Sequence, residues 1–82
     1  MVIVIKGLSY NEVEEYLEAR GAGEGSLDIY VDDYGFVDAD AGDMRRMVEI
    51  QVNALTQDEE DFLVEVTEDL ADAEPDAEVI YL

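Results

Sequence analysis

Eight carboxylates between residues 58 and 72 are the side chains of this chain that most directly suggest chemistry. They are Asp58, Glu59, Glu60, Asp61, Glu65, Glu68, Asp69 and Asp72, with no Lys or Arg among them. Carboxylates bind metal ions, transfer protons or pair with cationic side chains. Because the chain has 23 Asp and Glu in total, some of them must lie close together. Proximity of two carboxylates is therefore no evidence of acid–base catalysis here.

The charge density of this segment matches that of a nucleic-acid backbone. As a helix, residues 58–72 would span about 21 Å, a length over which one strand of duplex DNA carries about six phosphates. Like charges at i,i+4 spacing destabilise a helix. Three such pairs occur here, Asp61–Glu65, Glu65–Asp69 and Glu68–Asp72. A charge run is also typical of an ordinary solvated helix face, so recognition and solvation both remain open as interpretations.

The residues for most other chemistry are missing. The chain has neither His nor Cys, which removes the commonest general base, the commonest transition-metal ligand and thiolate chemistry. Asp38, Asp40 and Glu49 occupy three ligand positions of a calcium-binding EF-hand loop, but Gly42 is one position too early and the flanking helices are absent. We predict a solvated turn there, and we expect no metal, no cofactor and no enzymatic activity.

A second acidic segment carries two tyrosines, Tyr30 and Tyr34. Aromatic rings beside carboxylates suit the binding of Arg side chains. One hypothesis is that Tyr30 and Tyr34 form an aromatic-acidic patch with their neighbours Asp28, Asp32, Asp33 and Asp38. Ordinary half-exposed packing of each tyrosine is the simpler alternative.

The hydrophobic pattern predicts the element order β-α-β-β-α-β. Strands are expected at 1–6, 27–32, 45–54 and 77–82, with a turn at 33–35 and a loop at 38–43. Capping boxes predict the starts of two helices, at 9–20 and 56–73. The boxes are Ser9 with Glu12 and Thr56 with Glu59. In the second helix Phe62, Leu63, Val66 and Leu70 are expected to face the core.

This order predicts one α+β domain over residues 1–82, a ferredoxin-like fold with an antiparallel sheet and two helices on one face. A weak internal repeat at an offset of 47 residues supports it, since strand and capping box recur together. Residues 2–5 and 79–82 are apolar on both faces, however, so the second sheet face needs a cover. We expect the segment 36–47 to cover it; a homodimer or a partner on that face is the alternative.

The net charge of −19 limits the partners. Residues 1–46 hold all four cations and 11 acids, net −7, whereas residues 47–82 hold 12 acids and no cation, net −12. Such a field repels DNA, RNA and anionic lipid and speeds encounter with basic surfaces. No signal peptide and no run of apolar residues long enough for a membrane span is visible, so we expect a cytoplasmic protein without membrane contact.

In size, charge and mixture of helix and strand, the chain resembles the small acidic decoys that phages use against restriction enzymes, CRISPR effectors or DNA-repair enzymes. The resemblance is to a class and implies an inhibitor that occupies the nucleic-acid-binding groove of a basic protein in the host cytoplasm. The expected contact residues are Asp58, Glu59, Asp61, Glu65, Glu68, Asp69, Asp72, Asp32, Asp33, Tyr34, Asp38 and Asp40. Two alternatives stand beside it. One is a small domain adapted to molar salt, whose acids serve solvation; the other is an acidic adaptor or antitoxin.

Overall fold

The computed structural model describes residues 1–40 and 43–82, and it describes side chains outside residues 38–43. The elements are β1 (Val2–Lys6), α1 (Tyr10–Ala19), β2 (Ile29–Asp40), β3 (Asp43–Val52), α2 (Gln57–Ala73) and β4 (Glu78–Tyr81). The predicted α+β class and the order β-α-β-β-α-β are therefore confirmed. In the described part of the chain, neither helix combines the length and the apolar character needed to cross a membrane.

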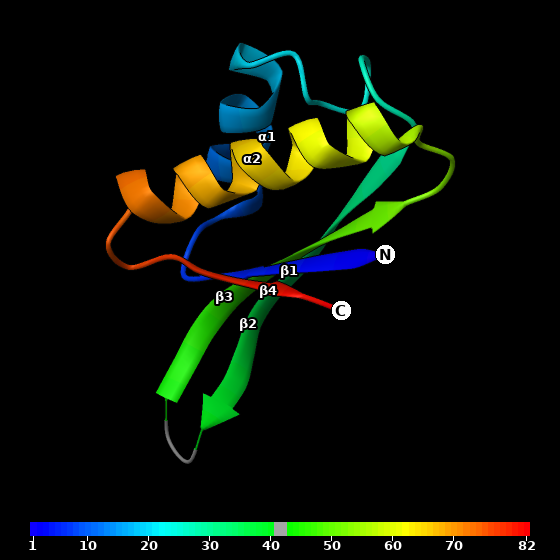
Figure 1. The fold of residues 1–82 in the computed structure, drawn as a ribbon. Coiled ribbons are helices and arrows are strands. Elements are labelled where there is room, and N and C mark those ends of the chain that lie inside the picture. Colours follow the sequence, from blue (N-terminus) through cyan, green and yellow to red (C-terminus); the bar gives the residue numbers. More distant parts are fainter. Residues whose placement is uncertain (41–42) are drawn as a thin grey trace.

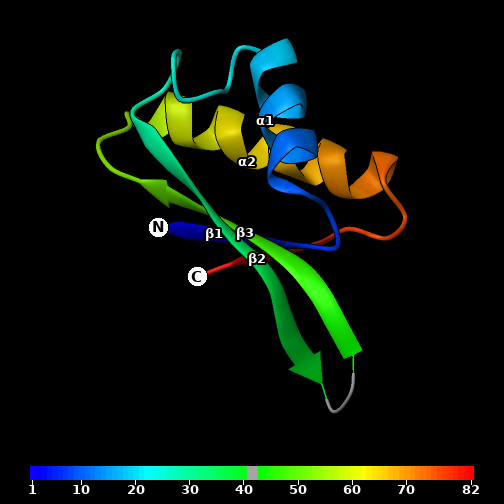
Figure 2. The ribbon, with the colours of Figure 1, turned by 180° about the vertical axis from the view of Figure 1, so that it is seen from behind.

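The four strands form one antiparallel sheet in the order β2-β3-β1-β4. Figures 1 and 2 show both helices on the same side of this sheet. Of the two, α1 contacts β2 and β3, whereas α2 contacts β4. The molecule thus has two layers, and α2 lies toward the opposite edge of the sheet from β2.

Both helices begin at the capping boxes that the sequence predicts. The Ser9 hydroxyl accepts a hydrogen bond from the Glu12 amide (3.2 Å), and the Glu12 carboxylate accepts one from the Ser9 amide (3.1 Å). Thr56 and Glu59 repeat the arrangement at the start of α2, at 3.2 and 3.0 Å. Each box satisfies amide groups that the first turn of a helix leaves without partners.

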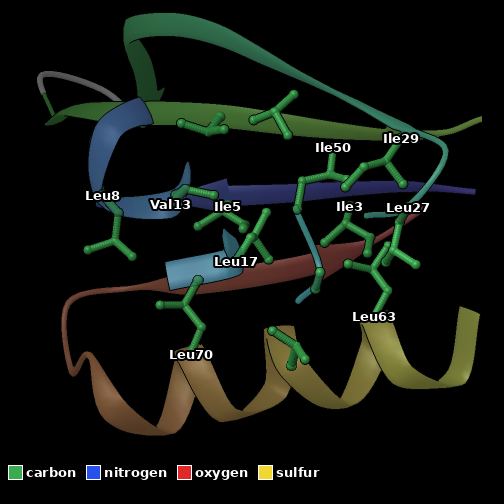
Figure 3. Close-up of a cluster of buried hydrophobic side chains, with 14 residues drawn as sticks. Ile3, Ile5, Leu8, Val13, Leu17, Leu27, Ile29, Ile50, Leu63 and Leu70 are labelled. Carbon is green, nitrogen blue, oxygen red and sulfur yellow. The ribbon is translucent and has the colours of Figure 1, made fainter. Parts of the chain in front are cut away.

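The core lies between the sheet and the helices. Ile3 and Ile5 of β1 are fully buried against α1 and α2 side chains that include Leu17, Leu63 and Leu70 (Figure 3). Alternate residues on each strand therefore face the helices, as the pleat of a strand requires.

One core residue of α2 differs from the prediction. Phe62 is 38% exposed, and Thr67 is fully buried instead. The buried stripe is thus Leu63, Val66, Thr67 and Leu70, at spacings of three and four residues. Burial of the Thr67 hydroxyl is compensated because it donates to the Val64 carbonyl at 2.9 Å and lies 2.7 Å from the Tyr81 hydroxyl.

The predicted turn at 33–35 is wrong, because β2 runs through it as one strand. Asp33 pairs with Val48 and Gly35 with Met47, which leaves Tyr34 as the extra residue of a β-bulge. Gly35 has a φ of +65°, and its amide donates to the Asp33 carboxylate at 2.8 Å. A bulge and a turn use the same residue types, so the sequence pattern alone does not separate them.

The predicted loop at 38–43 is also wrong in part, because β2 extends to Asp40 and β3 begins at Asp43. The segments 36–40 and 43–47 are consequently paired strands within the sheet. They do not fold across its second face, so the predicted cover is wrong. No other element of the described chain covers that face, which we call the open sheet face (Figures 1 and 2).

Candidate functional site

The outward side of α2 carries six exposed carboxylates, which we call the acidic ridge. Its members are Asp58, Asp61, Glu65, Glu68, Asp69 and Asp72. At about 100° per residue, they fall within an arc of about 100° opposite the buried side of the helix. The fold therefore gathers six of the seven predicted contact acids of α2 on one continuous surface, and Glu59 is the exception.

The spacing along the ridge is regular. Asp58, Asp61, Glu65, Glu68 and Asp72 follow one another at three and four residues, and each step rises about 4.5 or 6 Å along the helix axis. With Asp69 beside this row, the ridge holds six charges over about 21 Å, close to the number of phosphates on one DNA strand of that length.

No cation of the chain lies on α2. Arg20 stacks on the Tyr16 ring at 3.6 Å, Arg46 lies 4.8 Å from the centre of the Phe36 ring, and Arg45 pairs with Glu78 at 2.9 Å. Among the described side chains, the hydrogen bond found for the ridge is that from the Gln57 amide to Asp61, at 2.9 Å. The remaining ridge carboxylates are thus available to an external cation.

Two acids of the same helix have a different position. Glu59 and Glu60 are half-buried in the first turn, and Glu59 completes the capping box with Thr56. Acids in the first turn also stabilise the positive end of the helix dipole. Glu59, which the sequence suggests as a contact residue, therefore has a local role in starting α2.

The second acidic segment lies away from the ridge, because it belongs to β2 at the far edge of the sheet. Asp32 is half-buried and accepts a hydrogen bond from Gln51 at 3.0 Å, and Asp33 binds the bulge amide. Tyr34 is 46% exposed, and the Glu49 carboxylate raises the pKa of its hydroxyl. The side chains of Asp38 and Asp40 lie outside the described residues. The structure therefore does not bring this patch together with the acidic ridge.

A shallow cavity lies between the start of α1 and the β2–β3 hairpin. Its volume is about 170 Å³, below the roughly 300–1,000 Å³ of usual small-molecule sites. Seven residues line it: Ser9, Tyr10, Asn11, Asp33, Gly35, Phe36 and Arg46. The Ser9 hydroxyl is already engaged in the capping box, and Arg46 stacks on Phe36. Within the described residues, no group of three acids is placed to hold a metal ion.

A carboxylate pair that the sequence does not indicate connects α1 to the edge of the sheet. One oxygen of Glu14 is buried without a hydrogen-bond partner, and the Glu24 carboxylate beside it accepts the Val31 amide at 3.1 Å. Burial, followed by the charge of Glu24, raises the pKa of Glu14. The two residues are ten positions apart on different segments, so no local spacing signals the pair.

Comparison with known proteins adds no relative to this geometry: no protein-family model, no curated protein and no solved structure matches the chain.

Proposed function

We propose that this protein is a nucleic-acid mimic, an inhibitor that occupies the nucleic-acid-binding groove of a basic protein. The observation that carries the proposal is the acidic ridge, six exposed carboxylates and no cation on one side of a single helix. An ordinary helix surface intersperses opposite charges, because i,i+4 pairs of like charge destabilise it. The absence of any Lys or Arg from α2 is therefore a cost to folding that a role in recognition explains.

The mechanism is electrostatic and geometric. The net charge of −19 steers the protein toward a basic groove. There the ridge carboxylates replace phosphates and form charge-assisted hydrogen bonds with Lys and Arg of the target. Because α2 is held to the sheet by Leu63, Val66 and Leu70, these carboxylates reach the groove with little loss of conformational freedom. The basic targets suggested by the resemblance are CRISPR effectors, restriction enzymes and DNA-repair enzymes.

We also propose that the fold is ferredoxin-like. The strand order β2-β3-β1-β4, the antiparallel neighbours and the two helices on one sheet face support this assignment. In this fold each helix connects two parallel strands between which a third, antiparallel strand is inserted.

A specific observation favours a second function, a domain whose acids serve solvation at high salt. Exposed acids are not confined to α2, since Glu15 and Glu18 on α1 and Asp28 before β2 are also exposed. A protein adapted to molar salt would carry acids in all these places. An unfolded protein near physiological salt that folds only in molar salt would establish this second function and exclude the mimic.

The mimic is tested by capture and displacement. Nuclease-treated lysate is passed over the immobilised protein, and bound proteins are eluted with duplex DNA. We expect DNA to release basic nucleic-acid-binding proteins. The ridge variant Asp58→Lys/Glu65→Lys/Asp72→Lys should lose this capture.

The matched control is Glu15→Lys/Glu18→Lys/Asp28→Lys, which makes the same change in charge at exposed acids away from α2. It should retain most of the capture. Proteins that DNA does not displace, or equal loss in the two variants, would contradict the proposal.

A further inference from the structure

We propose that the open sheet face is a dimerisation surface that packs against the same face of a second copy of this chain. The proposal is independent of the acidic ridge, which lies on the other side of the molecule. Its starting point is an apolar strip on β1 and β4, made of side chains that point away from the helices.

The pairing of β1 and β4 defines this strip. Val4 pairs with Ile80, and the Val2 and Leu82 backbones exchange two hydrogen bonds, at 3.2 and 2.8 Å. Paired residues of an antiparallel sheet project to the same face. Because Ile3 and Ile5 face the helices, Val2, Val4, Ile80 and Leu82 all project from the open sheet face.

The strip residues are partly exposed to solvent, to different degrees. Val4 is only 7% exposed, Val2 and Ile80 are half-buried, and Leu82 is 74% exposed. Met47 of β3 pairs with Lys6, and Val37 of β2 pairs with Arg45. Both apolar side chains therefore project from the open sheet face as well. An apolar strip on an uncovered sheet face is typical of a site of protein association.

The low net charge of the open sheet face favours a second copy of this chain as its binding partner. Among the residues whose side chains the structure describes (1–37 and 44–82), the charged ones that project from the open sheet face are Lys6, Arg45, Asp32, Glu49 and Glu78, a net charge of −1. Two of these charges already neutralise each other in the Arg45–Glu78 ion pair. Two molecules of this protein repel each other on their other surfaces, so this nearly neutral face is where self-association costs least. A strongly basic partner would gain more by binding the acidic surfaces.

The area agrees with a reversible dimer. Four strands about 4.8 Å apart make a face about 19 Å wide, and strands of four to twelve residues, about eight on average, make it roughly 26 Å long. Two such faces bury an area near the lower limit of specific interfaces, about 1,000–1,200 Å² in total. In the dimer the sheets stack about 10 Å apart, and the two acidic ridges face outward in opposite directions.

The test is sedimentation equilibrium over a range of protein concentrations, at low and at molar NaCl. We expect a monomer–dimer equilibrium that tightens with salt, because salt screens the repulsion between two like-charged molecules. Binding of the acidic ridge to a basic target would instead weaken with salt. The dimer and the nucleic-acid mimic are therefore tested by different measurements, and either can fail without the other.

Substitution locates the interface. Leu82→Asp and Ile80→Asp should each weaken the dimer by at least about tenfold. Phe36→Asp makes the same chemical change at a residue that is 59% exposed but lies on the helix side of the sheet, and it should leave the dimer unchanged. Circular dichroism verifies that each variant folds. If Ile80→Asp does not fold, Leu82→Asp alone tests the interface. A monomer at all concentrations and salts, or a dimer that Phe36→Asp disrupts and Leu82→Asp does not, would overturn the proposal.

Discussion

Glu14 is a carboxyl group in a position where ionisation is unfavourable. Its buried oxygen lacks a donor, and the nearest acid, Glu24, is held in place by the Val31 amide. Glu12, two residues earlier and on the exposed side of α1, shows the opposite effect, because hydrogen bonds from Ser9 lower the pKa of its carboxyl group. The same residue type therefore stabilises the fold in one place and opposes it in the other.

The pH dependence of stability follows from the raised pKa of Glu14. Between its ordinary value of 4.5 and the raised value, the folded state binds more protons than the unfolded state. The free energy of unfolding therefore falls as the pH rises through this window. Glu14→Gln removes the titration, so it should be more stable than the wild type at pH 7 and equally stable near pH 4.

This comparison is made by urea unfolding at both pH values. Glu15→Gln, an exposed neighbour with the same loss of charge, controls for the smaller net charge. If Glu15→Gln gained as much stability as Glu14→Gln at pH 7, the local explanation would be wrong.

At the scale of elements, the helix starts and the antiparallel sheet are predictable here, whereas the register between β2 and β3 is not. Ser9 and Thr56 start both helices where the sequence predicts, because a capping box is a local signal within four residues. The bulge at Tyr34 depends on the register between β2 and β3, which no local pattern encodes. The position of the acidic patch is wrong for the same reason: most of its residues lie on the edge strand β2, not in a loop beside the acidic helix.

The acids of α2 predict a conflict between stability and function. Glu65→Lys converts the like-charge pairs with Asp61 and Asp69 into pairs of opposite charge. At low salt this should raise the free energy of unfolding by about 1 kcal/mol, while weakening capture of the basic target.

Urea unfolding at low salt measures the gain, and Glu65→Gln, which removes repulsion without adding attraction, should give a smaller one. The difference between Glu65→Lys and the wild type should shrink at 1 M NaCl, where the Debye length is about 3 Å. If Glu65→Lys were less stable than the wild type at low salt, repulsion among the ridge carboxylates would not destabilise the folded protein, and the prediction would be wrong.

For the whole molecule, charge opposes compactness. The chain has a radius of gyration of 12.2 Å and a net charge of −19, so its acids repel one another more when folded than when unfolded. Composition alone gives the net charge and therefore the sign of this effect. It does not predict which surface is nearly neutral, because that depends on how β1, β3 and β4 are paired.

We therefore expect the melting temperature to rise with NaCl. Screening between 0.1 and 1 M shortens the Debye length from about 10 to about 3 Å, and a gain of about 1 kcal/mol corresponds to roughly 4–8 °C in a domain of this size. Differential scanning calorimetry at low protein concentration measures it without a contribution from dimerisation. A melting temperature that is constant or falls with salt would contradict the expected self-repulsion.

The location of the cations has one more consequence. Lys6, Arg45 and Arg46 belong to the sheet, whereas all charged side chains of α2 are negative. The molecule consequently has a permanent electric dipole, directed from helix to sheet, in addition to its net charge. On a positively charged resin it should adsorb with α2 against the matrix and the open sheet face toward the solvent.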